Sequence, residues 1–77
     1  MLAANISGNR IKIARKDLKM DQIDLSAAIE LEHGLKITQS DISEIERGVR
    51  GVKDFELDII ARVLNVSPLW LLRGNEE

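Results

Sequence analysis

The sequence predicts an all-α fold of five short helices in one domain, on the basis of three features. First, the apolar residues of several segments recur at helical spacing. One example is the set Leu57, Ile60, Ala61 and Leu64. Second, these segments are flanked by residue types that typically begin or end helices. Third, no segment alternates apolar and polar residues with a period of two, so the sequence predicts no strands.

The first two helices are separated by a short turn. The first is predicted from about Gly8 to about Lys19, after a lead-in over residues 1–7 that has no clear pattern and is expected to be loose. Asp21 is a suitable cap for the second helix. Gly34 is its expected end, because glycine readily adopts the left-handed conformation that terminates helices.

The third helix, predicted over 39–47, is the most informative segment. Thr38 is placed to cap it, and Asp41 is placed to return a hydrogen bond to the cap residue. Gly48 stands where a helix-ending residue is expected. Its polar side chains are Gln39, Ser40, Ser43, Glu44 and Arg47. A short helix with a polar face, directly after another capped helix, is typical of a DNA-reading element.

The last two helices follow a loop over 48–53. Asp54 is expected to cap the fourth helix. Ser67, followed by a proline, is a strong signal for a new helix, which is predicted over 68–72. Residues 75–77 are expected to form a tail.

Composition limits the class of protein. The 77 residues suit a single domain with a small core. The formal net charge is −2, but residues 10–53 hold nine Lys/Arg against eight Asp/Glu, whereas residues 54–77 hold two against five. The N-terminal part is therefore weakly basic, and local charge decides phosphate affinity. The chain has no cysteine, no apolar run that could cross a membrane and no signal-peptide pattern, so we expect a soluble, cytoplasmic protein.

Four segments match motifs of one known family in order. Residues 10–15 (R-I-K-I-A-R) resemble its first helix, and 20–26 (M-D-Q-I-D-L-S) resemble the opening of its second. Residues 42–48 (I-S-E-I-E-R-G) match its recognition-helix signature, and 61–72 resemble its ending. Together they resemble the lambda-repressor-like (Cro/XRE) helix-turn-helix domains. An extra segment over 30–36 indicates an extended second helix.

The resemblance implies that the helix over 39–47 lies in the major groove of DNA. The implied base-reading residues are Gln39, Ser40, Ser43 and Glu44. Gln pairs with adenine, Ser contacts several bases, and Glu accepts a hydrogen bond from cytosine. The implied phosphate-contacting residues are Gln22, Thr38, Arg47, Arg50 and Lys53. Weaker candidates for phosphate contact are Lys36, Arg10 and Lys19. For each of these residues the alternative is an ordinary solvated side chain.

Other residues have structural interpretations. In the family, the pair that matches Arg15 and Glu46 forms an ion pair between the first and third helices. Trp70 is expected either in the core or at a weak homodimer contact through the fifth helix. His33 is expected on the surface, since it lacks the partners for a metal site. Three apolar residues lie off the main stripe of the fourth helix, and either packing or a dimer surface would explain them: Phe55, Ile59 and Val63.

The expected function is a sequence-specific, repressor-like transcriptional regulator that binds double-stranded DNA. We expect no cofactor, no small-molecule ligand, no metal and no membrane partner. The alternative is a protein-interaction module, antitoxin-like or an anti-repressor partner, that keeps the fold and binds DNA weakly. An enzyme is disfavoured because the chain lacks Cys and Tyr, has a single His and contains no Gly-rich phosphate loop.

Overall fold

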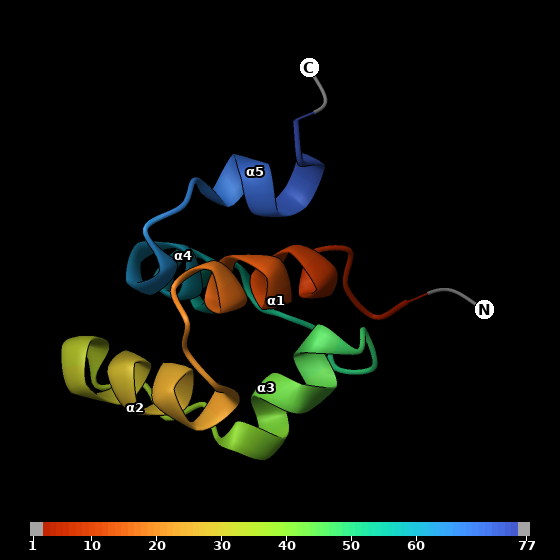
Figure 1. Cartoon of the computed structure of the whole chain (residues 1–77). Helices are drawn as coiled ribbons and strands as arrows, with labels where there is room; N and C mark the ends of the chain where they lie inside the picture. The colour runs from red at the N-terminus through yellow and green to blue at the C-terminus, as the bar shows by residue number, and fades with distance from the viewer. Residues whose placement is uncertain (1–2, 76–77) are drawn as a thin grey trace.

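The computed structural model describes residues 3–75, and five helices lie within them (Figure 1). They are α1 (Gly8–Asp17), α2 (Gln22–His33), α3 (Gln39–Glu46), α4 (Asp54–Leu64) and α5 (Pro68–Arg73). No strand occurs in this part of the chain. The predicted all-α fold of five helices with an extended second helix is therefore confirmed.

α1 lies at the centre of the molecule. It packs against α3, α4 and α5, while α2 packs against α3 and α4. Figure 1 shows α1 between α5 on one side and the α2–α3 pair on the other. The two helices that the sequence assigns to DNA recognition therefore form one end of the molecule, and α5 forms the opposite end.

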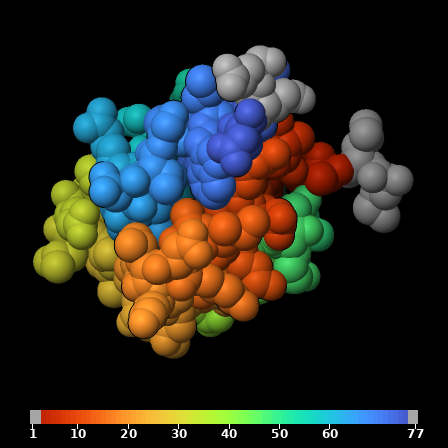
Figure 2. Space-filling view, turned by 45° about the horizontal axis from the view of Figure 1, so that its top comes forward, coloured from red at the N-terminus to blue at the C-terminus, as the bar shows by residue number. Residues whose placement is uncertain are grey.

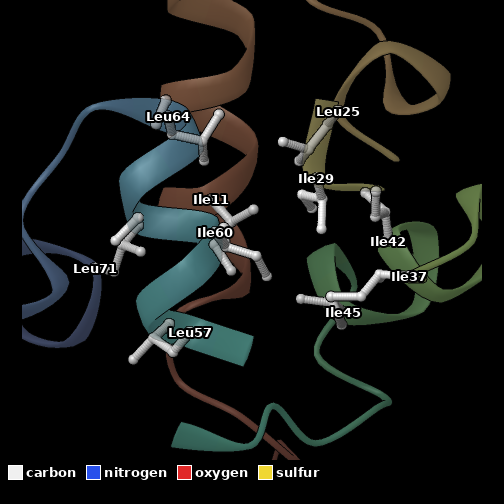
Figure 3. Packing of buried hydrophobic residues seen from close by; sticks show 12 residues of the cluster. Ile11, Leu25, Ile29, Ile37, Ile42, Ile45, Leu57, Ile60, Leu64 and Leu71 are labelled. Carbon is white, nitrogen blue, oxygen red and sulfur yellow. The ribbon is translucent and has the colours of Figure 1, made fainter. Parts of the chain in front are cut away.

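The core draws apolar side chains from all five helices and from the turn before α3. Its buried members are Ile11, Ala14, Leu25, Ile29, Ile37, Ile42, Ile45, Leu57, Ile60, Ala61, Leu64 and Leu71. Figure 3 shows the α2 and α3 residues facing those of α1 and α4 across this core. Because α3 buries its two isoleucines here, its polar side remains available at the surface.

Local hydrogen bonds begin α2 and α3 where the sequence predicts. The Asp21 carboxylate accepts the N–H of Asp24 at 2.8 Å, and the Thr38 hydroxyl oxygen accepts the N–H of Asp41 at 3.0 Å. Both helices have the complete capping box, since each acidic side chain also accepts the N–H of its cap residue. Gly34 ends α2 at φ 67°, as predicted.

The predicted start of α4 is wrong by one residue. Lys53 is the cap and Asp54 is already the first helical residue. The reason is Glu56, whose carboxylate accepts the N–H of Lys53 at 3.0 Å. Glu56 thus acts as the third residue of the helix in a capping box, returning a hydrogen bond to the cap residue Lys53.

The lead-in differs from the loose segment expected over 1–7. Residues 1–2 lie outside the described residues, but Asn5 is firmly attached. Its Oδ1 accepts the N–H groups of Ser7 and Gly8, at 3.0 and 2.7 Å, and so serves the first amides of α1. Its Nδ2 donates to the carbonyls of Ile45 and Arg50, at 3.1 and 2.8 Å. One amide group therefore joins the lead-in to the end of α3 and to the following loop.

The extra segment over 30–36 lengthens α2 and then returns to the core. The hydroxyl of Ser26 donates to the carbonyl of Ile37, and the Ile37 side chain is buried. Leu35 packs against the core beside it. The connection from α2 to α3 is thus anchored at its α3 end.

Candidate nucleic-acid interface

The outer side of α3 presents the four predicted base-reading residues. Gln39 and Ser40 are exposed, and Ser43 and Glu44 are partly exposed. At about 100° of rotation per residue, their four positions fall on one side of the helix. The structure therefore brings these residues together on a surface that a duplex could meet.

The first residues of α2 and α3 are joined by a side-chain hydrogen bond. Gln39 donates through Nε2 to the Oε1 of Gln22, at 2.8 Å. Gln22 in turn donates through Nε2 to the Oε1 of Glu46, at 3.1 Å. Gln39 keeps its own Oε1 acceptor and a second amide hydrogen free of these bonds. Its side chain is therefore oriented while part of its hydrogen-bonding capacity remains available for a base.

Arg15 and Glu46 form a buried, two-pronged ion pair between α1 and α3. The Nε and Nη2 atoms of Arg15 donate to the two carboxylate oxygens, at 2.7 and 2.9 Å. A third guanidinium nitrogen donates to the carbonyl of Met20 at 2.8 Å. The hydrogen bonds from Arg15 to Glu46 raise the pKa of Arg15 above its ordinary value. The pair fixes α3 to α1 and also fixes the oxygen that Gln22 uses.

Four of the predicted phosphate-contacting residues lie at the surface. Thr38, Arg47 and Lys53 are exposed, and Gln22 is partly exposed at the start of α2. The Nζ of Lys53 lies 5.9 Å from the centre of the Phe55 ring, which is within cation–π range. Thr38 and Arg47 flank the two ends of α3, whereas Lys53 stands at the start of α4.

Arg50, the fifth predicted phosphate-contacting residue, makes several polar contacts within the protein. Its Nη1 and Nη2 atoms donate to the two Glu56 oxygens at 3.1 and 3.0 Å. Its Nη1 also donates to the carbonyl of Gly51 at 2.8 Å, and its Nε lies 3.7 Å from Asp41. The sequence assigned Arg50 to phosphate contact and did not reveal that α4 supplies it with a carboxylate partner.

Two carboxylates beside Arg50, those of Glu56 and Asp41, have lowered pKa values. Hydrogen bonds from Arg50 are the main cause for Glu56, and the N–H of Lys53 adds to the effect. For Asp41 the main cause is the hydrogen bonding from Thr38, with a smaller contribution from the charge of Arg50. The hydrogen bonds to Glu56 likewise raise the pKa of Arg50.

The weaker candidates for phosphate contact separate into two groups. Arg10 donates through Nη1 to the carbonyl of Leu71 at 3.3 Å, so it serves the end of α5. Lys19 and Lys36 are exposed. The backbone of Lys19 adopts a φ of 59° in the turn between α1 and α2.

The remaining apolar candidates divide into residues that pack against the core and residues that are exposed. Ile59 and Val63 pack against the core, whereas Phe55 is half exposed. Trp70 is partly buried beside a hollow of about 270 Å³ that also contains Ala14, Leu18 and Leu64. Figure 2 shows this face, where α5 (blue) lies against α1 (orange).

Two residues with structural roles at the site were missed. Asn5 fell in a segment without periodicity, although an Asn just before a helix is a known capping signal. Glu56 was missed because its partner Arg50 was assigned to phosphate. An acidic residue two positions after Asp54 could have indicated both the helix start and a partner for Arg50.

His33 lies exposed at the end of α2. Among residues 3–75, no group of acidic and histidine side chains could hold a metal ion. Within the same residues, no helix has the length and apolar character required to cross a membrane.

α2 and α3 are consecutive helices joined by a turn. α3 buries its apolar side in the core and exposes its polar side, which is the arrangement of a helix-turn-helix domain. The sequence profile of the helix-turn-helix family matches residues 11–71, and the chain belongs to this family. The predicted resemblance to lambda-repressor-like domains is confirmed by this match and by the relatives that follow.

One similar protein is the HTH-type transcriptional regulator DicA of Escherichia coli (strain K12). It is 37% identical over 70 residues, which cover 91% of this chain and 47% of DicA. The chain thus spans about half the length of this relative. A similar solved structure is that of the P22 c2 repressor protein in complex with a synthetic operator. The TM-score is 0.77 and the identity 28%, with 92% of this chain and 98% of the repressor chain covered. Neither relative's name describes an enzyme.

Proposed function

We propose that this protein is a sequence-specific, repressor-like regulator of transcription that inserts α3 into the major groove of double-stranded DNA. The observation that carries the proposal is the hydrogen-bonded series from Glu46 through Gln22 to Gln39, which orients an exposed amide at the start of α3. The operator complex of the P22 c2 repressor supports it, because the structural likeness covers nearly all of both chains. This role would place the protein in the compartment that holds the DNA, the cytoplasm of a bacterial cell.

In this proposal the residues have two kinds of role. The base-reading residues are Gln39, Ser40, Ser43 and Glu44, and each well-formed contact contributes about 1–3 kcal/mol of discrimination. The residues that contact phosphates and set the orientation are Gln22, Thr38, Arg47 and Lys53. We leave Arg50, which the family resemblance also assigned to phosphates, out of the second group, because its guanidinium is paired with Glu56.

The test is a selection from random duplex DNA with purified protein at low salt. Wild-type protein should enrich one motif, and the Gln39→Ala/Ser40→Ala variant should lose it. Lys16→Ala is a control, since it alters an exposed residue on α1 that has no proposed role in DNA binding. If folded wild-type protein enriches no motif, the proposal fails. The protein-interaction module, which the two relatives do not favour, would then become the leading function.

We further propose that two copies form a weak dimer through α5. Leu69 is 65% exposed, and Leu72 is also exposed on the same short helix. Trp70, which lies between them in the sequence, and the exposed Leu18 line the hollow beside α1 and α5. The molecule is 32 Å long in its greatest dimension. Two copies bound one helical turn apart, about 34–36 Å, could therefore meet at such a face.

Sedimentation in the presence and absence of operator duplex tests the dimer. Leu69→Glu should abolish pairing on DNA without lowering the melting temperature, because its side chain is exposed. Leu31→Glu is the control, since Leu31 is 87% exposed on α2, away from α5. Pairing that survives Leu69→Glu would exclude this face.

A further inference from the structure

The proposed reading helix is acidic. α3 contains three carboxylates in its eight residues, Asp41, Glu44 and Glu46, and has no Lys or Arg within its bounds. Each phosphate of a duplex carries a negative charge, so an uncompensated carboxylate near the groove opposes binding. The protein must offset this charge from outside α3.

Two arginines from other elements approach the carboxylates of α3. Arg15 of α1 neutralises Glu46 inside the protein. Arg50, from the loop after α3, brings its Nε to 3.7 Å from the carboxylate of Asp41. Glu44 is also close enough to Arg50 for its charge to stabilise the guanidinium.

Arg50 is held in this place from several directions. Its N–H donates to the carbonyl of Glu44 at 3.3 Å, and its own carbonyl accepts from Asn5 at 2.8 Å. Glu56 fixes the guanidinium through two hydrogen bonds. Glu56 also lies in the first turn of α4 and accepts the N–H of Lys53, so the positive end of that helix balances part of its charge. The guanidinium therefore retains charge to offset Asp41.

We propose that Arg50 is a positioning residue that lets an acidic recognition helix approach DNA by offsetting the carboxylate of Asp41, and that it does not itself bind a phosphate. This inference rests on the proposed DNA-binding function. It assigns to the internal contacts of Arg50 a role in affinity for DNA, in addition to any role in stability.

A double-mutant cycle tests the inference, with affinity for the selected duplex measured by fluorescence anisotropy. Arg50→Gln should weaken binding about tenfold, within the range of coupling between charged neighbours. Asp41→Asn keeps an acceptor for the capping box and should change wild-type affinity little. In the Arg50→Gln background, Asp41→Asn should restore most of the lost affinity.

The opposite result is also defined. If Arg50 binds a phosphate, the two substitutions act independently. In that case Arg50→Gln lowers the slope of log affinity against log salt by about one, and Asp41→Asn gives no selective rescue. Either finding would overturn the inference. Wild-type protein that binds no duplex would instead overturn the proposed function.

Two controls keep the test informative. Arg62→Gln removes the same charge from the exposed Arg62–Asp58 pair on α4 and should leave DNA affinity nearly unchanged. Because Arg50→Gln leaves the buried Glu56 without its cation, thermal melting is measured first. If that variant does not fold, the cycle is repeated with Glu56→Gln present in all four proteins.

Discussion

Glu46 accepts two hydrogen bonds from the guanidinium of Arg15, at 2.7 and 2.9 Å, and its Oε1 also accepts one from Gln22. A single carboxylate therefore belongs both to the ion pair that joins α1 to α3 and to the polar series that ends at Gln39. Stability and the orientation of the proposed reading surface share this group.

Loss of that carboxylate should destabilise the fold. Glu46→Ala leaves the Arg15 guanidinium buried without its partner, and breaking a buried pair in this way costs about 3–5 kcal/mol. Glu44→Ala alters a partly exposed carboxylate on the same helix and should have little effect. Thermal and urea unfolding measure both variants, and equal melting temperatures would refute the prediction.

The contact between Gln22 and Gln39 should be visible as coupling in DNA binding. Gln22→Ala removes the acceptor that orients Gln39, so discrimination at the base read by Gln39 should decrease along with affinity. In the Gln39→Ala background, Gln22→Ala should reduce affinity and discrimination less than it does in the wild-type protein. The two effects should differ from additivity by about 0.5–3 kcal/mol in a cycle measured with operator and single-base variants. Simple additivity would show that each side chain acts alone.

Gly8 allows the backbones of α1 and α3 to approach closely. A Cβ atom at this position would overlap the backbone oxygen of Ile45, which cannot move without displacing α3. We therefore expect Gly8→Ala to lower the free energy of unfolding by about 1–3 kcal/mol. Gly51→Ala is the matched control, because its Cβ would meet only ordinary contact, 3.7 Å from the oxygen of Ala4. Equal denaturation midpoints for the two variants would contradict this account.

Glu56 should contribute to acid sensitivity. Its pKa is lowered in the folded protein, mainly by hydrogen bonds from Arg50. Near neutral pH the carboxylate is ionised in both the folded and the unfolded chain, so the contribution to stability is complete. As pH falls below the ordinary Glu value, about 4.3, the unfolded chain takes up the proton first, and the contribution declines until pH has also fallen through the lower pKa of the folded protein.

Urea unfolding over this pH range tests the effect. Glu56→Gln should have lower stability at neutral pH but a shallower loss on acidification than wild-type protein. Asp58→Asn, which removes an exposed carboxylate from the same helix, is the control. An unchanged acid dependence in Glu56→Gln would rule out this contribution.

The sequence predicted the helices well because their boundaries depend on short-range chemistry. The capping boxes at Asp21 and Thr38 involve residues three positions apart, and Gly34 acts through its own backbone. The start of α4 was predicted one residue too late, because Lys53 has no capping side chain and Glu56 accepts its N–H instead.

The polar contacts between helices were harder to predict. Asn5 reaches acceptors 40 and 45 residues away, so no local pattern reveals its role. The two hydrogen bonds between Arg50 and Glu56 depend on how the loop after α3 folds against α4. Residue type and family motif identified the exposed face of α3, whereas the hydrogen bond that orients Gln39 required the packing of α2 beside it.

The extension of α2 places the far end of that helix well away from its start, where Gln22 lies. Its twelve residues span about 18 Å, with Gln22 at one end and His33 at the other. At Gly34 an added Cβ would meet no atom within 4 Å, and the chain then returns to the core through Leu35 and Ile37. The tip can therefore change in length or composition while Gln22 and Gln39 keep their spacing. It offers an attachment point for a fluorophore or an affinity tag that leaves the reading surface undisturbed.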